Sequence, residues 1–189
     1  SKGELVCKNP FPTMPLKFWN DKNDNKFKDA YFNRFPNTWH HGDFAEIKTT
    51  RGFVIHGRSD TTLNPGGVRL GTAEIYSEVE KFKEIKESIV VGQSWDNDIR
   101  IVLFIVMNTK FFLTEDLLKK IKAQIRENAS PRHVPSKVIV VKDIPRTKSG
   151  KIVELAVKNT IEGNNIKNEE ALANPKALEQ FKGLKELSI

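Results

Sequence analysis

The sequence predicts an α+β fold: a small domain with a three-stranded sheet and flanking helices, preceded by a β-rich segment and followed by a polar tail. The prediction depends on two observations. Helix-like and strand-like segments follow one another between about residues 61 and 162 in the order α-β-β-α-β-α. Within that order, Ile101 to Met107 is apolar at every position, which is typical of a strand in the middle of its sheet.

The β-rich segment begins with a predicted strand over residues 3–8, which Pro10 and Pro12 end because proline cannot join an interior ladder. Residues 13–41 are predicted to be irregular. They contain many aromatic side chains among Asn and Asp, so we expect these rings to pack against another part of the protein.

A β-hairpin is predicted next, with strands at Phe44 to Ile47 and Phe53 to His56. Gly52 in the connection is expected to supply the positive φ that such turns need. Asp43 is expected to stand just before the first of these strands.

The first helix of the α+β domain is predicted after Thr72, a residue type favoured at helix N-caps. Strands are predicted at Ser88 to Val91 and at Ile101 to Met107. Thr114 is expected to cap the clearest helix, because two acidic residues follow it and a buried stripe at helical spacing precedes Pro131. That stripe consists of Leu117, Leu118, Ile121 and Ile125.

The remaining predicted elements are a strand at Lys137 to Val141, a helix that ends near Gly163, and a short docking helix in the tail. One side of the helix before Gly163 is predicted to carry Ile152, Leu155, Ala156 and Asn159. The apolar anchors of the tail are Leu172, Leu178, Phe181 and Leu184.

The charge and the apolar runs exclude several classes of function. The formal net charge is +7, but the lysines are mixed with glutamates as on solvated helix faces, so the charge does not indicate nucleic-acid binding. No apolar run approaches the roughly 20 residues of a membrane span. The four histidines lack metal-ligand spacing. A single cysteine fits a reducing compartment, and we expect a cytoplasmic protein with no membrane partner.

Two motifs point to a function. The chain reads GRSDTTLNPGGVRLGTAEIY from Gly57 to Tyr76 and PRTKSGK from Pro145 to Lys151, about 90 residues further on. Each motif alone is explained by a surface turn. Together, in this order and at this distance, they resemble the adenylate-forming acyl-CoA synthetases, which join a carboxylate to the α-phosphate of ATP and then pass the acyl group to CoA.

The resemblance assigns the catalytic role to Lys151, whose ammonium would bridge the substrate carboxylate and the α-phosphate. Gly150 would support the loop by adopting a conformation closed to other residues, and the loop is expected to be mobile. The bland alternative for this motif is a solvent-facing turn ahead of a helix.

The same resemblance assigns nucleotide binding to Asp43, through the ribose hydroxyls, and to Arg58 and Arg69, through ribose or phosphates. His41 departs from the Ser or Thr of many relatives, so the Gly-Asp pair is the firmer part of that match. We expect no metal site on this chain, and Mg²⁺ is implied only as the companion of ATP.

Three further residues are implied to serve movement and CoA. Asp60 matches the hinge about which a C-terminal lid swings between two poses. Gly67 resembles the glycine beside the pantetheine tunnel, and Arg126 resembles an arginine that contacts the CoA nucleotide. Because a helix C-terminus favours cations in any case, Arg126 also has a purely structural explanation.

The implied layout has three parts. Residues 1–59 would be a remnant of the last β-subdomain of a larger N-terminal domain, residues 60–162 the mobile lid, and residues 163–189 a helical tail. The family's phosphate loop and acyl pocket belong to that N-terminal domain, so we expect a truncated chain that is inactive alone.

Several alternatives stay open. Val68-Arg69, preceded by Asn64-Pro65-Gly66, resembles the acetoacetyl branch of the family, whose acid substrate is acetoacetate. A ligase for acetate, propionate or another short acid is the nearest competitor. A non-catalytic module that binds a nucleotide or CoA comes second, and a basic nucleic-acid binder third.

Overall fold

The computed structural model of the chain describes residues 1–166 and 169–189, and it divides into two compact units. The N-terminal unit is Ser1–Asp60 and the C-terminal unit is Thr61–Ile189. Among the described residues, no helix combines the length and the apolar character needed to cross a membrane.

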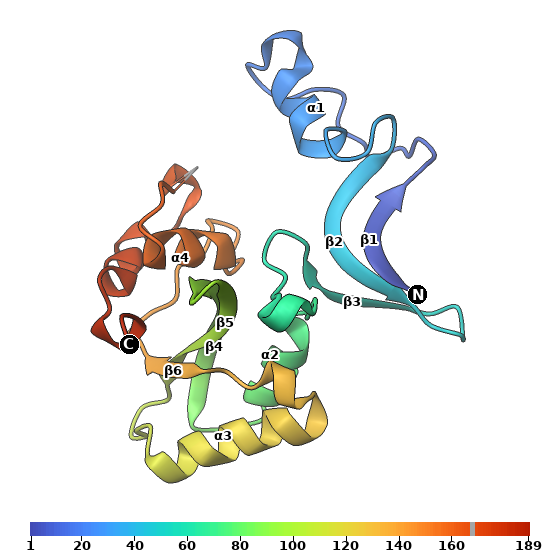
Figure 1. The fold of residues 1–189 in the computed structure, drawn as a ribbon. Helices are drawn as coiled ribbons and strands as arrows, with labels where there is room; N and C mark the ends of the chain where they lie inside the picture. Colours follow the sequence, from blue (N-terminus) through green and yellow to red (C-terminus); the bar gives the residue numbers. More distant parts are fainter. Residues whose placement is uncertain (167–168) are drawn as a thin grey trace. The chain divides into compact units, whose positions relative to one another are not determined.

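The N-terminal unit is built on an antiparallel sheet with the strand order β1-β2-β3 (Figure 1). Its strands are β1 (Lys2–Cys7), β2 (Trp39–Ile47) and β3 (Phe53–Arg58). A 3-10 turn at Lys22–Asp24 and the helix α1 (Asn25–Tyr31) precede β2. The prediction of a strand near residues 3–8 and of the hairpin is therefore confirmed.

The prediction that residues 13–41 are irregular is wrong where α1 and the start of β2 lie. The Asp21 carboxylate accepts hydrogen bonds from the backbone N–H groups of Lys26 and Phe27 at 3.0 and 2.8 Å. Tyr31 stacks on Trp39 with a centroid distance of 3.7 Å. Helix α1 is held by these contacts rather than by an apolar stripe, so periodicity did not reveal it.

Two details of the predicted hairpin are also wrong. Arg51, with φ of 65°, adopts the left-handed conformation that was expected of Gly52. Asp43 lies inside β2 and pairs with Arg58 of β3, instead of standing before the strand. Strand β2 is longer than expected because its first residues pair with β1.

The C-terminal unit confirms the predicted α+β fold, with the strand order β4-β5-β6. Strands β4 (Ile85–Trp95) and β5 (Asp98–Met107) are antiparallel, and β6 (Lys137–Val140) runs parallel to β5. The fully apolar strand is central, as its composition predicted. The helices of this unit are α2 (Ala73–Val79), α3 (Glu115–Asn128) and α4 (Glu154–Ile161).

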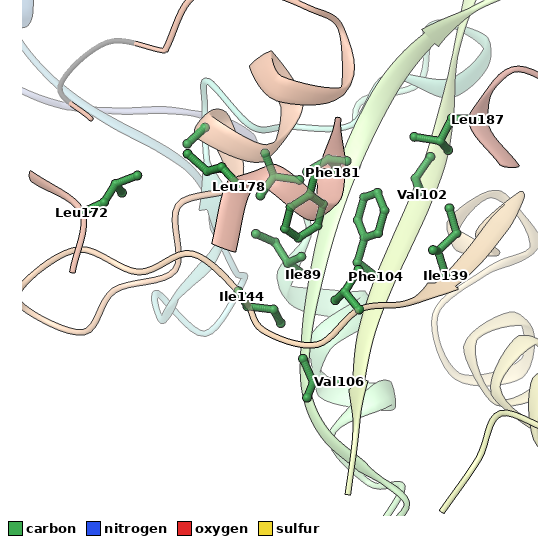
Figure 2. Close-up of a cluster of buried hydrophobic side chains, with 14 residues drawn as sticks. Ile89, Val102, Phe104, Val106, Ile139, Ile144, Leu172, Leu178, Phe181 and Leu187 are labelled. Carbon is green, nitrogen blue, oxygen red and sulfur yellow. The ribbon is translucent and has the colours of Figure 1, made fainter. Parts of the chain in front are cut away.

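Side chains of β5 alternate between two cores on opposite faces of this sheet. Ile101, Leu103 and Ile105 pack with α2 and α3. Val102, Phe104 and Val106 pack with α4 and the tail (Figure 2). This period of two is what an interior strand with both faces covered requires.

The two predicted helix caps have different outcomes. Thr114 caps α3, because its hydroxyl oxygen accepts a hydrogen bond from the Leu117 N–H at 3.2 Å. Thr72 itself has helical torsions and its side chain makes no capping bond to α2. The Thr72 prediction is therefore wrong, and residues 65–67 form a 3-10 turn shortly before this helix.

Of the residues predicted to lie along one side of the last helix, only Ala156 is buried. Ile152 and Leu155 are 37% and 41% exposed, and the buried positions of α4 are Ala156, Val157 and Thr160. Helix α4 begins only at Glu154, so Ile152 lies outside the periodic face that its spacing suggested. The tail docks as predicted, but through the 3-10 turns Glu169–Ala171, Pro175–Phe181 and Lys185–Leu187 rather than an α-helix.

Candidate active site

A charged cluster forms in the N-terminal unit where β2 lies beside β3. Arg58 Nη1 is 3.5 Å from Asp43 Oδ1 and donates to the His41 carbonyl at 3.3 Å. His41 Nδ1 lies 2.7 Å from Asp43 Oδ2. Arg58 Nε is also 3.5 Å from Asp60 Oδ1. The sheet register therefore brings Asp43 beside Arg58, although 15 residues separate them, and Asp60 joins them from just beyond β3.

Gly42 makes this cluster sterically possible, and the sequence pattern alone did not give it that role. Its φ is 85°, and a Cβ at this position would lie 2.7 Å from Arg58 Nη2. The guanidinium therefore lies against the backbone at a distance that only glycine allows. The signal available beforehand was the Gly-Asp pair itself, without its reason.

A cavity of about 570 Å³ opens beside the cluster. Trp39, Arg34 and Tyr31 line it together with Arg58 and Asp60. Trp39 is 7% exposed, and its Nε1–H has no acceptor among the described residues. The lining thus includes two guanidinium groups and the Tyr31 hydroxyl together with the Asp60 carboxylate, a combination that suits a ligand with both hydroxyl and anionic groups.

Lys151 lies in a loop of the C-terminal unit that closes on itself. The Thr147 N–H donates to the Lys151 carbonyl at 2.8 Å, and the Gly150 N–H donates to the Thr147 carbonyl at 2.8 Å. The Lys151 N–H in turn donates to Thr147 Oγ1 at 3.1 Å. Gly150 has φ of 84°, which this tight turn requires and which L-residues rarely adopt.

The Lys151 side chain is exposed, while its backbone is held by this turn. No hydrogen bond or ion pair to another described residue engages its ammonium group. The expectation of a freely mobile loop stays untested, but the turn is already ordered by hydrogen bonds. The arrangement presents an unpaired cation at the end of a defined turn, which is suited to an external anionic group.

Arg146 connects this loop to the rest of its unit, and sequence reasoning did not single it out. Its Nη2 lies 2.9 Å from Glu87 Oε2 on β4, and its Nη1 donates to the Gly150 carbonyl at 3.1 Å. Its backbone N–H donates to Asn174 Oδ1 in the tail at 2.8 Å. The motif contained Arg146, but nothing in the sequence indicated its distant partners.

The remaining predicted residues, Gly67, Arg69 and Arg126, belong to the C-terminal unit. Gly67 has φ of 74° in the 3-10 turn Pro65–Gly67, and a Cβ there would meet no described atom within 4 Å. Arg69 follows this turn and is half-buried. Arg126 is exposed in the last turn of α3.

The turn at Gly67 has an anchor that the sequence did not reveal. The Asp98 carboxylate, at the start of β5, accepts from the Gly66 N–H at 3.0 and 2.9 Å. Charge-assisted bonds of this kind hold a backbone turn more firmly than neutral ones. Asp98 therefore belongs with the support of this turn.

Comparisons with known proteins show what this chain is similar to. Residues 74–151 match the family described as AMP-binding enzyme C-terminal domain. The chain is 60% identical over 98% of its length to an acetoacetyl-coenzyme A synthetase of Rhizobium meliloti (strain 1021), of which it covers 29%. It is 48% identical over 98% of its length to an acetoacetyl-CoA synthetase of Xenopus tropicalis, of which it covers 28%.

A solved structure is similar along the whole chain. The acetoacetyl-CoA synthetase from Streptomyces lividans superposes with a TM-score of 0.91 at 40% identity, covering 100% of this chain and 29% of that one. The chain thus spans less than a third of the length of these relatives.

Proposed function

We propose that the chain is the C-terminal part of an acid–thiol ligase. Residues 74–151 match the family described as AMP-binding enzyme C-terminal domain, and the chain is similar to acetoacetyl-CoA synthetases. The parent protein activates acetoacetate with ATP and transfers the acetoacetyl group to CoA. One observation of the geometry supports this most: the Lys151 ammonium is exposed and unpaired among the described residues, on a turn ordered by hydrogen bonds.

In the first step, a carboxylate oxygen of the acid attacks the α-phosphorus of ATP. The new O–P bond forms as the bond to pyrophosphate breaks, which gives acyl-adenylate and pyrophosphate. Lys151 contacts the carboxylate and the α-phosphate oxygens, so it orients them and offsets the negative charge that accumulates between them. Gly150 supports the turn that presents this cation.

Nucleotide recognition is the role of the cluster in the N-terminal unit. The Asp43 carboxylate accepts from the ribose hydroxyls, and Arg58 places its planar cation beside the ribose or the phosphates. Arg69 contributes a second guanidinium. Mg²⁺ is expected to enter as the companion of ATP.

In the second step, the CoA sulfur attacks the acyl carbonyl carbon, the thiol proton leaves, and AMP departs as the thioester forms. Asp60 is the hinge about which the lid exchanges the Lys151 face for the CoA face. The open space beside Gly67 supports its place along the pantetheine path. Arg126, exposed and cationic, contacts the CoA nucleotide.

The partners of this site are therefore ATP and AMP, CoA, acetoacetate and the protein's own N-terminal domain. The acyl pocket and the phosphate loop lie in that domain, which the family supplies outside the region covered by this chain. We expect the 189-residue chain to form no acyl-CoA by itself.

The test uses the full-length parent and the variant Lys151→Ala. Pyrophosphate exchange driven by acetoacetate should fall by about 10²- to 10³-fold, the usual cost of removing one donor that stabilises developing charge. Thioester formation from preformed acetoacetyl-adenylate should continue. Lys148→Ala is the matched control, because Lys148 is exposed in the same turn and should leave both half-reactions intact.

Three outcomes would contradict parts of this proposal. Equal loss of both half-reactions in Lys151→Ala would remove the adenylation role of this lysine. Faster turnover of acetate or propionate than of acetoacetate, in a panel of short acids, would favour another short-chain acyl-CoA ligase. Binding of CoA or ATP without acyl-adenylate formation by the wild type would favour a non-catalytic binding module.

A further inference from the structure

Arg146 directly precedes the turn from Thr147 to Lys151 and makes four polar contacts. Its guanidinium joins Glu87 of β4 at 2.9 Å and the Gly150 carbonyl at 3.1 Å. Its backbone N–H donates to Asn174 at 2.8 Å, and its carbonyl accepts from the Ala173 N–H at 2.8 Å. One residue thus connects the central sheet, the tail and the peptide that directly precedes Lys151.

The tail extends these connections along the loop. Thr147 and Leu172 form an antiparallel bridge, and the Lys148 N–H donates to the Ala171 carbonyl at 3.0 Å. Asn174 also donates through Nδ2 to the Ile144 carbonyl at 3.0 Å and to Asp143 Oδ2 at 2.7 Å. The tail therefore pairs with the loop on the edge opposite the residues that close the turn.

The position of the tail is set by its burial. Leu172 is 6% exposed, and Leu178 and Phe181 are buried in the core beside α4. The Phe181 ring meets the Phe104 ring of β5 edge-on at 4.9 Å (Figure 2). Burying such apolar side chains stabilises the docked tail, so the loop is paired with a firmly placed segment.

We propose that Arg146 is a positioning residue for Lys151, and that Glu87 and the tail residue Asn174 hold Arg146 in place for this task. This inference rests on the proposed function of Lys151 and deepens it. The Arg146 guanidinium fixes the Gly150 carbonyl, so it sets the orientation of the peptide from which Lys151 extends. A misplacement of about 1 Å in a reacting group can cost about 10²-fold in rate.

The expected effect is specific to one half-reaction. In the full-length protein, Arg146→Gln should lower the kcat of acyl-adenylate formation by about ten- to a hundredfold. The KM for ATP and the rate of transfer of a preformed acyl-adenylate to CoA should stay within about twofold of the wild type, because a change confined to the adenylation transition state lowers kcat without raising KM. Arg146→Lys should restore part of the rate, because an ammonium can pair with Glu87 but lacks the fork that also reaches the Gly150 carbonyl.

Two further variants test the connections from the other side. Glu87→Gln and Asn174→Ala should lower adenylation in the same direction, and Glu87→Gln combined with Arg146→Gln should cost no more than Arg146→Gln alone. Both single variants should also be cut faster by trypsin after Lys148 or Lys151, because the turn is less firmly paired. This proteolysis needs no activity, so it reports on the loop whatever the acid substrate is.

Arg100→Gln is the matched control. Arg100 also joins β5 to the tail, since it donates to the Leu187 and Ile189 carbonyls at 2.6 and 2.9 Å. These contacts involve neither the residues of the turn nor the partners of Arg146. Arg100→Gln should lower Tm without lowering adenylation selectively.

The proposal is overturned if Arg146→Gln adenylates at the wild-type rate, or if all variants, Arg100→Gln included, lose both half-reactions in proportion to Tm. If Arg146→Gln does not fold, wild-type adenylation and unchanged trypsin sensitivity in both Glu87→Gln and Asn174→Ala overturn it. A wild-type parent that forms no acyl-adenylate from any acid would instead overturn the proposed function.

Discussion

The two units hold their charged site residues in opposite ways. In the N-terminal unit, Arg58 lies 3.5 Å from both Asp43 and Asp60, so cation and carboxylates are already paired. In the C-terminal unit, the Lys151 ammonium has no described partner, while the backbone of its turn is closed by hydrogen bonds. A paired cluster is suited to binding one ligand, whereas an unpaired cation on an ordered turn is suited to being brought to an anionic ligand that is bound elsewhere.

Two glycines, one in each site, have the same backbone conformation in different surroundings. Gly42 and Gly150 have nearly the same φ, 85° and 84°. A Cβ at Gly42 would strike the Arg58 guanidinium at 2.7 Å, whereas one at Gly150 would meet nothing within 4 Å. The same backbone conformation thus serves close packing of charges in one unit and a free-standing turn in the other.

The largest effect on the KM for ATP is expected from removing the acceptor in the paired cluster. Asp43→Asn in the full-length parent should raise the KM for ATP by about a hundredfold, because a charge-assisted hydrogen bond contributes about 1.5–3 kcal/mol. Asp29→Asn, an exposed carboxylate on α1, is the control. Similar KM values for both variants would show that the cluster does not bind the nucleotide.

The two glycines give the next largest effect. Gly42→Ala should raise the KM for ATP about tenfold, because the φ strain of about 1–2 kcal/mol is joined by displacement of Arg58. Gly150→Ala should suffer the strain alone and leave the KM for ATP unchanged, since its side chain enters open space. Steady-state kinetics of both variants measure the KM for ATP. Equal KM values would show that the close approach of Gly42 to Arg58 does not affect ATP binding.

Tyr76 should matter for the C-terminal unit alone. Its hydroxyl donates to Glu154 at 2.5 Å and accepts from the Val90 N–H at 3.0 Å, so it connects α2 with β4 and α4. Tyr76→Phe should lower the free energy of unfolding of the 189-residue chain by about 1–2 kcal/mol in urea titrations. The KM for ATP of the full-length protein should not change.

The same side chain gives a prediction at high pH. Burial, followed by the charge of Glu154, holds the pKa of Tyr76 well above its ordinary value of 10.0. The folded state therefore favours the neutral phenol, and stability should fall as pH rises past 10.0. Tyr76→Phe should lose less stability over that range, and an equal loss in wild type and variant would contradict the prediction.

The smallest effect is expected at Glu78, which joins α2 to α3. Hydrogen bonds from Lys81 at 2.7 Å lower the pKa of Glu78 below its ordinary value of 4.5, and Gln124 also donates to it at 2.8 Å. Because the folded pKa is depressed, this stabilisation is present above pH 4.5 and is lost as pH falls through the folded pKa.

Glu78→Gln should therefore cost up to about 1 kcal/mol at pH 7 and progressively less below pH 4.5, measured by urea unfolding at each pH. Glu80→Gln is the control, because Glu80 is exposed on the same helix end. A cost for Glu78→Gln that is constant with pH would show that the lost interaction is not ionic.

Local patterns in the sequence predicted much of this fold because they report on residues a few positions apart. The apolar run of β5 and the Thr114 cap of α3 are confirmed. Helix α1 was not predicted, because aromatic stacking from Tyr31 to Trp39 supports it instead of an apolar stripe. The predicted side of α4 included Ala156, which is buried, but also Ile152, which precedes the helix.

The site residues likewise divide into those that local sequence patterns predicted and those that they did not. The sequence motifs pointed to Lys151, Asp43 and Arg58, because the spacing within a motif can be recognised in the sequence alone. Nothing in the sequence indicated that Glu87 and Asn174 meet at Arg146, because their hydrogen bonds join segments far apart and have no spacing of their own.

The sequence by itself determined which residues can offer a cation, a carboxylate acceptor or a positive φ, because those properties belong to single side chains and to short runs of backbone. Only the tertiary structure decided which of these charges are neutralised by a partner and which stay unpaired. The physical reason is that electrostatic and hydrogen-bond energies depend on distances of a few ångströms, and folding alone sets these distances between residues remote in the chain.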